Sequence, residues 1–225
     1  MDSANLFASF FERNLQKEQI IISPAIEIKF FSRPKILKKT TNLIFTSSNG
    51  VKAAGQAVND NIRAICVGDR TTSLASSLGY SAEKYGDNVE QLIKKLCLSK
   101  KIEGDILHIR GKYTKVDLMN RLREAGFLCH EWEGYDQIAK NLSFQALNAF
   151  KNGEKIILPI FSERSGRLLK DQIPNFDKCH IIAISSAVAN VFLDVSPASI
   201  SEAQTPDLVG MRSSTKTVLE NAHLE

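Results

Sequence analysis

The sequence has no hydrophobic run long enough to cross a membrane. Its longest apolar stretches, such as residues 20–22 and 180–184, are far shorter than the roughly 18 residues that a spanning helix needs. The opening residues, MDSANLFASFF, contain no basic segment ahead of an apolar one, so they do not read as a secretory signal. We therefore expect a cytoplasmic protein that does not bind a membrane.

Cysteine is scarce and widely spaced. Cys66, Cys97, Cys129 and Cys179 form no C-x-x-C pair and have no histidine cluster of zinc-site spacing nearby. We predict reduced structural thiols, with no disulfide and no metal site. Three histidines each sit beside apolar residues, a pattern typical of packed side chains: His108, His130 and His180.

Several familiar catalytic motifs are missing. The stretch FTSSNG lacks the lysine of a phosphate-binding P-loop, and VGDRTTSLASSLG lacks the glycine spacing of a dinucleotide fingerprint. No G-x-S-x-G serine is present. A catalytic pair of carboxylates stays open, because nothing in the sequence singles one out.

Positive charge is concentrated in the middle of the chain. Residues 25–139 hold 18 Lys+Arg against 13 Asp+Glu, whereas residues 1–24 hold 2 against 3 and residues 140–225 hold 9 against 9. One interpretation is a solvated lysine-rich surface, and the other is attraction for a polyanionic ligand. Nucleic acid is disfavoured, because few aromatic residues interleave with the lysines and no nucleic-acid-binding motif appears.

Hydrophobic periodicity predicts an alternation of strands and helices. Apolar residues at helical spacing, from Leu6 to Leu15 behind a Ser3 cap, predict a first amphipathic helix. Strands are predicted near 19–23, 25–31, 42–46, 63–67, 105–109, 127–135, 155–161 and 180–185. Helices are predicted near 48–57, 71–79, 88–98, 116–125, 143–151, 163–171, 186–193 and 205–220. This alternation is typical of α/β folds with parallel sheets covered by helices on both faces.

Small polar residues follow four of the predicted strands, in a faint internal repeat. FTSSN begins at Phe45 and VGDRTT at Val67, while FSERS begins at Phe161 and ISSAV at Ile184. Two similar α/β units are one explanation, and the general preference for Ser and Thr at helix caps is the other. In parallel sheets such strand ends lie beside helix N-termini, whose free N–H groups attract carboxylate or phosphate.

The motifs together resemble one known family. LIFTSSNGVKA, ICVGDRTTSLASSLGYSAE, DNVEQLIKKL, ILHIRGKYTKVDLMNRLREAGFLCHEWEGYD and ILPIFSERSG occur in the order found in uroporphyrinogen-III synthases. The resemblance covers about residues 19 to 208. It implies two doubly wound, flavodoxin/Rossmann-like parallel-sheet domains joined by a two-stranded linker.

One of the two domains is discontinuous in that family. Carried over, residues 1–24 and 139–225 form the discontinuous domain, and residues 28–132 form the continuous one. Residues 25–31 and 130–137 are the connecting strands. The basic middle segment then coincides with the continuous domain.

The resemblance implies a substrate and a reaction. The substrate is hydroxymethylbilane, a linear tetrapyrrole with eight carboxylates, which loses water and closes to uroporphyrinogen III with inversion of the last pyrrole ring. No cofactor is implied, because the pyrrole nitrogen supplies the electron push. We expect a monomer whose partner is this small molecule, with no nucleic acid and no membrane.

Site residues follow from the resemblance and the strand ends. Tyr135 matches the family tyrosine best placed to assist departure of the hydroxyl, although a tyrosine packed in a connecting strand remains the alternative. The other candidates are expected to bind substrate: Thr46, Ser47, Ser48, Asn49, Gly68, Thr71, Arg110, Gly111, Ser162, Arg164, Ser165, Ser185 and Ser186. Arg110 is also a candidate for supporting the loop that follows it.

The sequence departs from the family pattern at two places. Val188 stands where many members carry a second threonine, so binding there would rely on Ser185 and Ser186. The family pattern also places a strand before the first helix, whereas here that helix opens the sequence. We therefore expect a reduced sheet in the discontinuous domain. A different class of function, a non-enzymatic sensor or carrier closing on a small polyanion, would use a similar fold.

Overall fold

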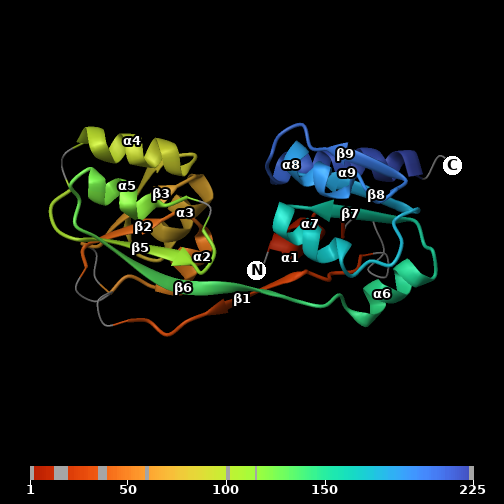
Figure 1. Ribbon diagram of the computed structural model, residues 1–225, viewed down its shortest axis with the longest axis horizontal. Coiled ribbons are helices and arrows are strands. Elements are labelled where there is room, and N and C mark those ends of the chain that lie inside the picture. The colour runs from red at the N-terminus through yellow and green to blue at the C-terminus, as the bar shows by residue number, and fades with distance from the viewer. Residues whose placement is uncertain are drawn as a thin grey trace. The chain divides into compact units, whose positions relative to one another are not determined.

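The computed structural model describes residues 3–12, 20–34, 40–58, 61–99, 102–114 and 116–222 (Figure 1). The chain divides into two compact units. Unit 1 comprises Met1–Glu27 and Ala139–Glu225, and unit 2 comprises Ile28–Ile138. Both boundaries fall within strands, one in β1 (Ile26–Phe30) and the other in β6 (Cys129–Ala139).

The sheet of unit 2 has the strand order β1-β6-β5-β2-β3-β4. Its other strands are β2 (Asn42–Phe45), β3 (Arg63–Val67), β4 (Ser81–Gly86) and β5 (Ile106–Gly111). The strands β6, β5, β2, β3 and β4 all pair in parallel. The strand β1 runs antiparallel to β6, because Phe31 N donates to Gly134 O and Lys140 N donates to Ala25 O.

Two apolar layers cover this sheet, one on each face. Alternate residues of β2 explain them, since Leu43 and Phe45 belong to one buried cluster and Ile44 to the other. The first layer contains α2 (Ser48–Ala54) and α3 (Asp69–Ser77), and the second contains α4 (Val89–Ser99) and α5 (Leu118–Glu124). Helices on both faces of a parallel sheet are the arrangement predicted from the sequence.

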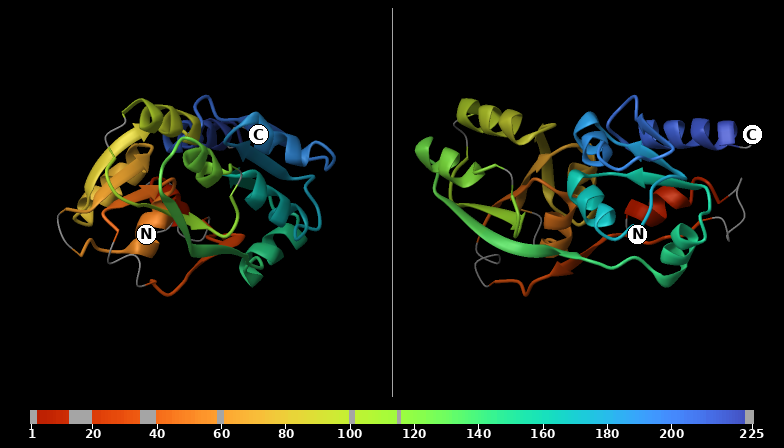
Figure 2. Two further views of the ribbon diagram at one scale, coloured as in Figure 1. Left: turned by 60° about the vertical axis from the view of Figure 1, so that its left-hand side comes forward. Right: turned by 45° about the vertical axis from the view of Figure 1, so that its right-hand side comes forward.

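Unit 1 contains a smaller parallel sheet of order β7-β8-β9. Its strands are β7 (Ile156–Ile160), β8 (Cys179–Ala183) and β9 (Ser199–Glu202). One face packs against α6 (Phe144–Lys151), α7 (Glu163–Lys170), α8 (Ser186–Ala189) and a 3₁₀ turn at Asn190–Phe192. The other packs against α1 (Ser3–Ala8) and α9 (Leu208–Ala222), the blue helix of Figure 2.

Three predictions of elements need correction. Of the strand predicted near 19–23, residues 20–23 do not form a strand, and residue 19 lies outside the described residues. Ile20 and Ile21 pack into the two apolar clusters of unit 1, and Pro24 has no N–H to donate to a sheet. The strands β4 and β9 were not predicted, because both are edge strands with the polar sequences SAEKYG and SISE. The predicted first helix ends at Ala8, and Leu15 lies outside the described residues.

The start of α2 lies against β5 because residue 50 is glycine. A Cβ added to Gly50 would lie 2.6 Å from the carbonyl oxygen of Ile109.

We predict that Gly50→Ala destabilises the protein by about 1–3 kcal/mol, since backbone must shift to admit the methyl group. Urea unfolding monitored by circular dichroism measures this. Lys52→Ala, on the exposed side of the same helix, should change stability by less than about 0.5 kcal/mol. Equal midpoints for the two variants would contradict the close packing of α2 on β5.

Candidate active site at the strand ends

The carboxyl ends of the parallel strands of unit 2 meet at one edge of the sheet. Phe45 pairs with both Cys66 and Ile109, and Gly111 pairs with Tyr135. The chain leaves β2 toward β3 and β4 on one side, and returns through β5 to β6 on the other. The strand order therefore reverses between β2 and β5, the place where open α/β sheets bind ligands.

The N-terminus of α2 lies at this switch point. Ser47 is its N-cap, with an extended backbone (φ −155°, ψ 146°), and its hydroxyl accepts from Asn49 N at 3.2 Å. Ser48 follows as the first helical residue, where helix geometry provides no intrahelical acceptor for the N–H. No acidic residue occupies the first turn, so no carboxylate of the helix competes for its positive end. This end can bind an anion.

The end of β3 is arranged differently. Gly68 has φ +76°, a left-handed conformation that favours glycine, and its N–H already donates to Gly86 O at 2.8 Å. Thr71 lies in the first turn of α3 and is only 6% exposed. Asp69 at the same turn binds Lys84 at 2.8 Å. The carboxylate of Asp69 thus partly neutralises the positive end of the α3 dipole.

Arg110 is fully engaged by its neighbours. Its Nε and one Nη donate to the two carboxylate oxygens of Glu131 at 2.9 and 3.2 Å, and the same Nη contacts Glu133 at 3.1 Å. The other Nη donates to the carbonyls of Gly111 and Lys112. The Glu131 carboxylate raises the pKa of Arg110. Because five N–H groups meet five acceptor contacts, Arg110 supports the loop after β5.

Tyr135 lies directly over Gly111. A Cβ at position 111 would be 2.9 Å from Cε2 of the tyrosine ring and 3.2 Å from its hydroxyl oxygen. The backbone completes the contact, since Lys112 N donates to Tyr135 O at 2.9 Å. Tyr135 is 6% exposed and belongs to the same apolar cluster as Phe45. Gly111 therefore allows the ring to occupy this position.

Thr46 is held by a histidine. Its Oγ1 lies 3.2 Å from Nε2 of His108 on β5, which joins the two strands across the switch point. His108 is 3% exposed, and burial lowers its pKa from 6.5 to about 4. The ring is therefore neutral near pH 7, and its hydrogen bond to Thr46 is one between neutral groups.

The strand ends of unit 1 repeat the capping pattern. Ser162 caps α7: its hydroxyl accepts from Ser165 N at 3.1 Å and lies 2.8 Å from the Ser165 hydroxyl. Arg164 occupies the first turn of that helix. Ser185 caps the short α8 through its backbone, and Ser186 is exposed. Ile160 and Ala183 pair in register, so Ser162 and Ser185 follow neighbouring strands.

The structure also shows how deeply Val188 and the histidines are buried. Val188 is 2% exposed within an apolar cluster, so it packs in the core of unit 1. The prediction of packed histidines holds for His108 and is wrong for His130. The His130 side chain is 42% exposed and lies 3.4 Å from Asp105, and the partly exposed His180 shares a 2.9 Å hydrogen bond with Ser199.

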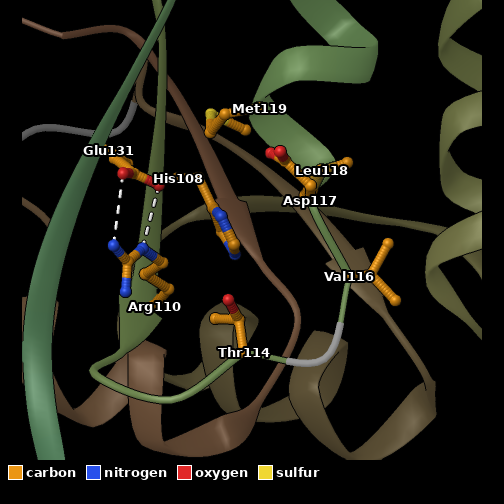
Figure 3. A pocket seen from close by; sticks show the side chains of 8 residues that line it. All are labelled: His108, Arg110, Thr114, Val116, Asp117, Leu118, Met119 and Glu131. Carbon is orange, nitrogen blue, oxygen red and sulfur yellow. Dashed lines mark hydrogen bonds and ion pairs between the residues drawn. The ribbon is translucent and has the colours of Figure 1, made fainter.

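A pocket of about 340 Å³ opens beside β5 within unit 2 (Figure 3). Its lining residues are His108, Arg110, Thr114, Val116, Asp117, Leu118, Met119 and Glu131. Sequence reasoning missed it, although a histidine between Ile106 and Arg110 on the buried face of a strand was a usable signal.

Over the described ranges, the acidic, histidine and cysteine side chains form no group able to hold a metal ion. No helix in those ranges has the length and hydropathy of a membrane span.

Comparison with known proteins decides the family. The family model described as uroporphyrinogen-III synthase HemD matches residues 13–211. The chain belongs to the uroporphyrinogen-III synthase family. The resemblance inferred from the motifs is therefore confirmed. No curated protein sequence matches the chain.

Solved uroporphyrinogen-III synthase structures share the fold. The enzyme from Helicobacter pylori superposes with a TM-score of 0.67 at 18% identity, over 86% of this chain and 91% of that chain. A mutant enzyme from the extremely thermophilic bacterium Thermus thermophilus gives a TM-score of 0.55 at 12% identity, over 97% and 95% of the two chains. At these identities the similarity establishes the mixed α/β fold with parallel sheets.

The buried His108 predicts a pH dependence of stability. Its folded-state pKa of about 4 lies below its ordinary value of 6.5, so between these values the unfolded chain binds a proton that the folded protein does not. Stability should therefore fall as the pH drops through this window, by about 3 kcal/mol from this residue. The glutamine of the His108→Gln variant does not titrate in this window. Between pH 6.5 and pH 4, its free energy of unfolding should therefore fall by about 3 kcal/mol less than that of the wild type.

Urea unfolding of both proteins at the two ends of the window measures the difference. His180→Gln serves as the control, because His108 and its contribution remain in place. Identical losses in wild type and His108→Gln would show that His108 does not carry the effect.

Proposed function

We propose that this protein cyclises hydroxymethylbilane to uroporphyrinogen III. The observation that carries the proposal is the family match over residues 13–211. It favours a hydro-lyase of tetrapyrrole biosynthesis over a non-enzymatic sensor or carrier. The arrangement of each unit supports it, because hydroxyls and helix N-termini gather at the carboxyl ends of parallel strands, where a substrate with many carboxylates can be bound.

The domain organisation of the family is part of this proposal. Residues 28–132 correspond to the continuous doubly wound domain, and residues 1–24 with 139–225 to the discontinuous one. Residues 25–31 and 130–137 are the two-stranded linker. The strand order reversing between β2 and β5 supports a doubly wound unit 2, and the antiparallel pairing of β1 with β6 supports the linker.

Substrate carboxylates are proposed to bind mainly at two helix starts. In unit 2 these groups are the N-terminus of α2 with Thr46, Ser47, Ser48 and Asn49. In unit 1 they are the start of α7, with Ser162, Arg164 and Ser165. Ser185 and Ser186 add hydroxyls after β8, and Gly68 and Thr71 contribute at β3. Arg110 acts indirectly, by holding the carbonyls of Gly111 and Lys112.

Tyr135 is the proposed catalytic residue. Its hydroxyl donates a hydrogen bond to the departing hydroxyl of the terminal hydroxymethyl group, while the pyrrole nitrogen pushes electrons toward the bond that breaks. The hydroxyl takes up a proton and leaves as water, and the substituted carbon of the last ring attacks the resulting cation. The bond from that carbon to its neighbouring methylene then breaks, and the methylene bonds instead to the other α carbon of the same ring. That carbon releases its proton, so the ring is inverted and the proton taken up by the hydroxyl is returned. The protein contributes position and electrostatic stabilisation of the charge that develops.

The direct test supplies enzymatically generated hydroxymethylbilane and separates product isomers I and III. We expect isomer III to predominate in the presence of the protein without any added cofactor. Closure without ring inversion gives isomer I. Accumulation of isomer I alone, at the same rate as in a protein-free sample, would overturn the proposed function.

Tyr135→Phe removes the hydroxyl and keeps the ring, so it tests the role of the hydroxyl alone. Because the volume and packing of the ring are nearly kept, we expect an intact fold and a kcat for isomer III lower by about 10²-fold or more. Gly111→Ala keeps the hydroxyl but displaces the ring, since the new Cβ would overlap Cε2 at 2.9 Å, and should also lower kcat. Full activity in Tyr135→Phe would remove this residue from the mechanism while leaving the family assignment in place.

A further inference from the structure

The pocket beside β5 has a histidine nitrogen without a hydrogen bond. His108 is 3% exposed, and its Nε2 is engaged by Thr46 at 3.2 Å. Within the part of the chain that the structure describes, the buried Nδ1 has no hydrogen-bond partner. Leaving a buried polar nitrogen unpaired is unfavourable. The ring lines the pocket, between the Arg110–Glu131 pair and Val116 in the view of Figure 3, so a molecule bound there can supply the missing partner.

The charges of the described lining disfavour an anion. Arg110 is its one cationic side chain, and all five of its N–H groups already meet Glu131, Glu133 and the carbonyls of Gly111 and Lys112. Two carboxylates line the same pocket. Asp117 accepts from Asn120 as the N-cap of α5, and Glu131 accepts from Arg110. A carboxylate has about four acceptor sites, so both retain capacity for a donor.

Apolar side chains also line the pocket, next to Asp117. Figure 3 shows Val116 and Leu118 across the pocket from the Arg110–Glu131 pair, with Met119 above the histidine ring. The volume of about 340 Å³ lies at the lower end of the range for small-molecule sites. Such a lining suits a small molecule with a cationic donor at one end and a short hydrocarbon part at the other.

We propose that this pocket binds a protonated primary amine of the form R–NH₃⁺. One ammonium N–H donates to Nδ1 of His108, the charge lies near Asp117 and Glu131, and the alkyl part packs on Val116, Leu118 and Met119. The neutral ring then carries its proton on Nε2 and donates it to Thr46 Oγ1. The hydroxyl proton of Thr46 is thereby left to donate elsewhere. This site adjoins the proposed tetrapyrrole site through the contact between His108 and Thr46, but the inference does not rest on the tetrapyrrole reaction.

A series of three probes of nearly equal size tests the ligand class. The full-length protein, labelled with ¹⁵N in its histidine rings, is titrated with propylammonium, propanamide and propionate near neutral pH. We expect propylammonium to bind most tightly and propionate most weakly, with a shift of the His108 Nδ1 signal and protonation at Nε2. Tighter binding of propionate, or no change in the His108 signals with any probe, would overturn the proposal.

Side-chain variants separate the two nitrogens of the ring. His108→Gln places an amide near the position of Nε2 and keeps a partner for Thr46, whereas His108→Asn places an amide near the position of Nδ1. We expect propylammonium to bind His108→Gln about tenfold or more weakly, and His108→Asn with a smaller loss. Equal affinity of the Gln variant and the wild type would overturn the role of Nδ1.

Asp117→Asn tests the charge. Asparagine also caps helices well, so the start of α5 should be kept. Propylammonium should bind about twofold to fivefold more weakly, and propanamide as in wild type. An equal loss for both probes would contradict a cation site. The wild-type titration decides the question by itself if a variant does not fold.

Discussion

The burial of β2 between β3 and β5 is the constraint on which unit 2 depends. Leu43, Ile44 and Phe45 are each 0% exposed, and their alternating side chains enter the two apolar layers. Burying each such side chain contributes about 1.5–3 kcal/mol. Both edges of β2 are paired in parallel, so its register is set by two neighbours at once. This fixed register places the polar residues after Phe45 at the carboxyl edge of the sheet.

The same packing places the start of α2. Gly50 brings the helix against the Ile109 carbonyl, and Gly111 at the end of β5 leaves room for the ring of Tyr135. Two glycines, one on a helix and one on a strand, thus determine how closely the start of α2 and the proposed catalytic tyrosine approach β5. The small residues around β5 serve close approach of backbone and ring, which larger side chains would prevent.

Charge is organised into two contrasting regions of unit 2. The start of α2 carries positive potential without an acidic residue in its first turn. In the second region, the charge of Arg110 is neutralised by ion pairs with Glu131 and Glu133. The arginine also lowers the pKa of the Glu131 carboxyl. The proposed polyanion site uses amides and hydroxyls, whereas the proposed cation site uses carboxylate oxygens and His108. The hydrogen bond between Thr46 and His108 connects the two sites. These exposed carboxylates act over short distances only, because salt screens charges beyond about 8 Å.

The sequence by itself determined the order of most strands and helices, the α/β class and the family. Apolar runs such as LIF and small capping residues after them reflect local rules, namely burial of a central strand and satisfaction of helix N–H groups. It did not reveal β4 and β9, because edge strands bury little and so carry little hydrophobic pattern. It also suggested a strand near 19–23, where Ile20 and Ile21 pack in the apolar clusters of unit 1 without pairing in its sheet. Only the tertiary structure decided that Arg110 is fully engaged, that Gly111 underlies Tyr135, and that His108 lines a pocket. Each of these depends on side chains brought together from different strands, and the distances between strands are set by packing that no local stretch of sequence encodes.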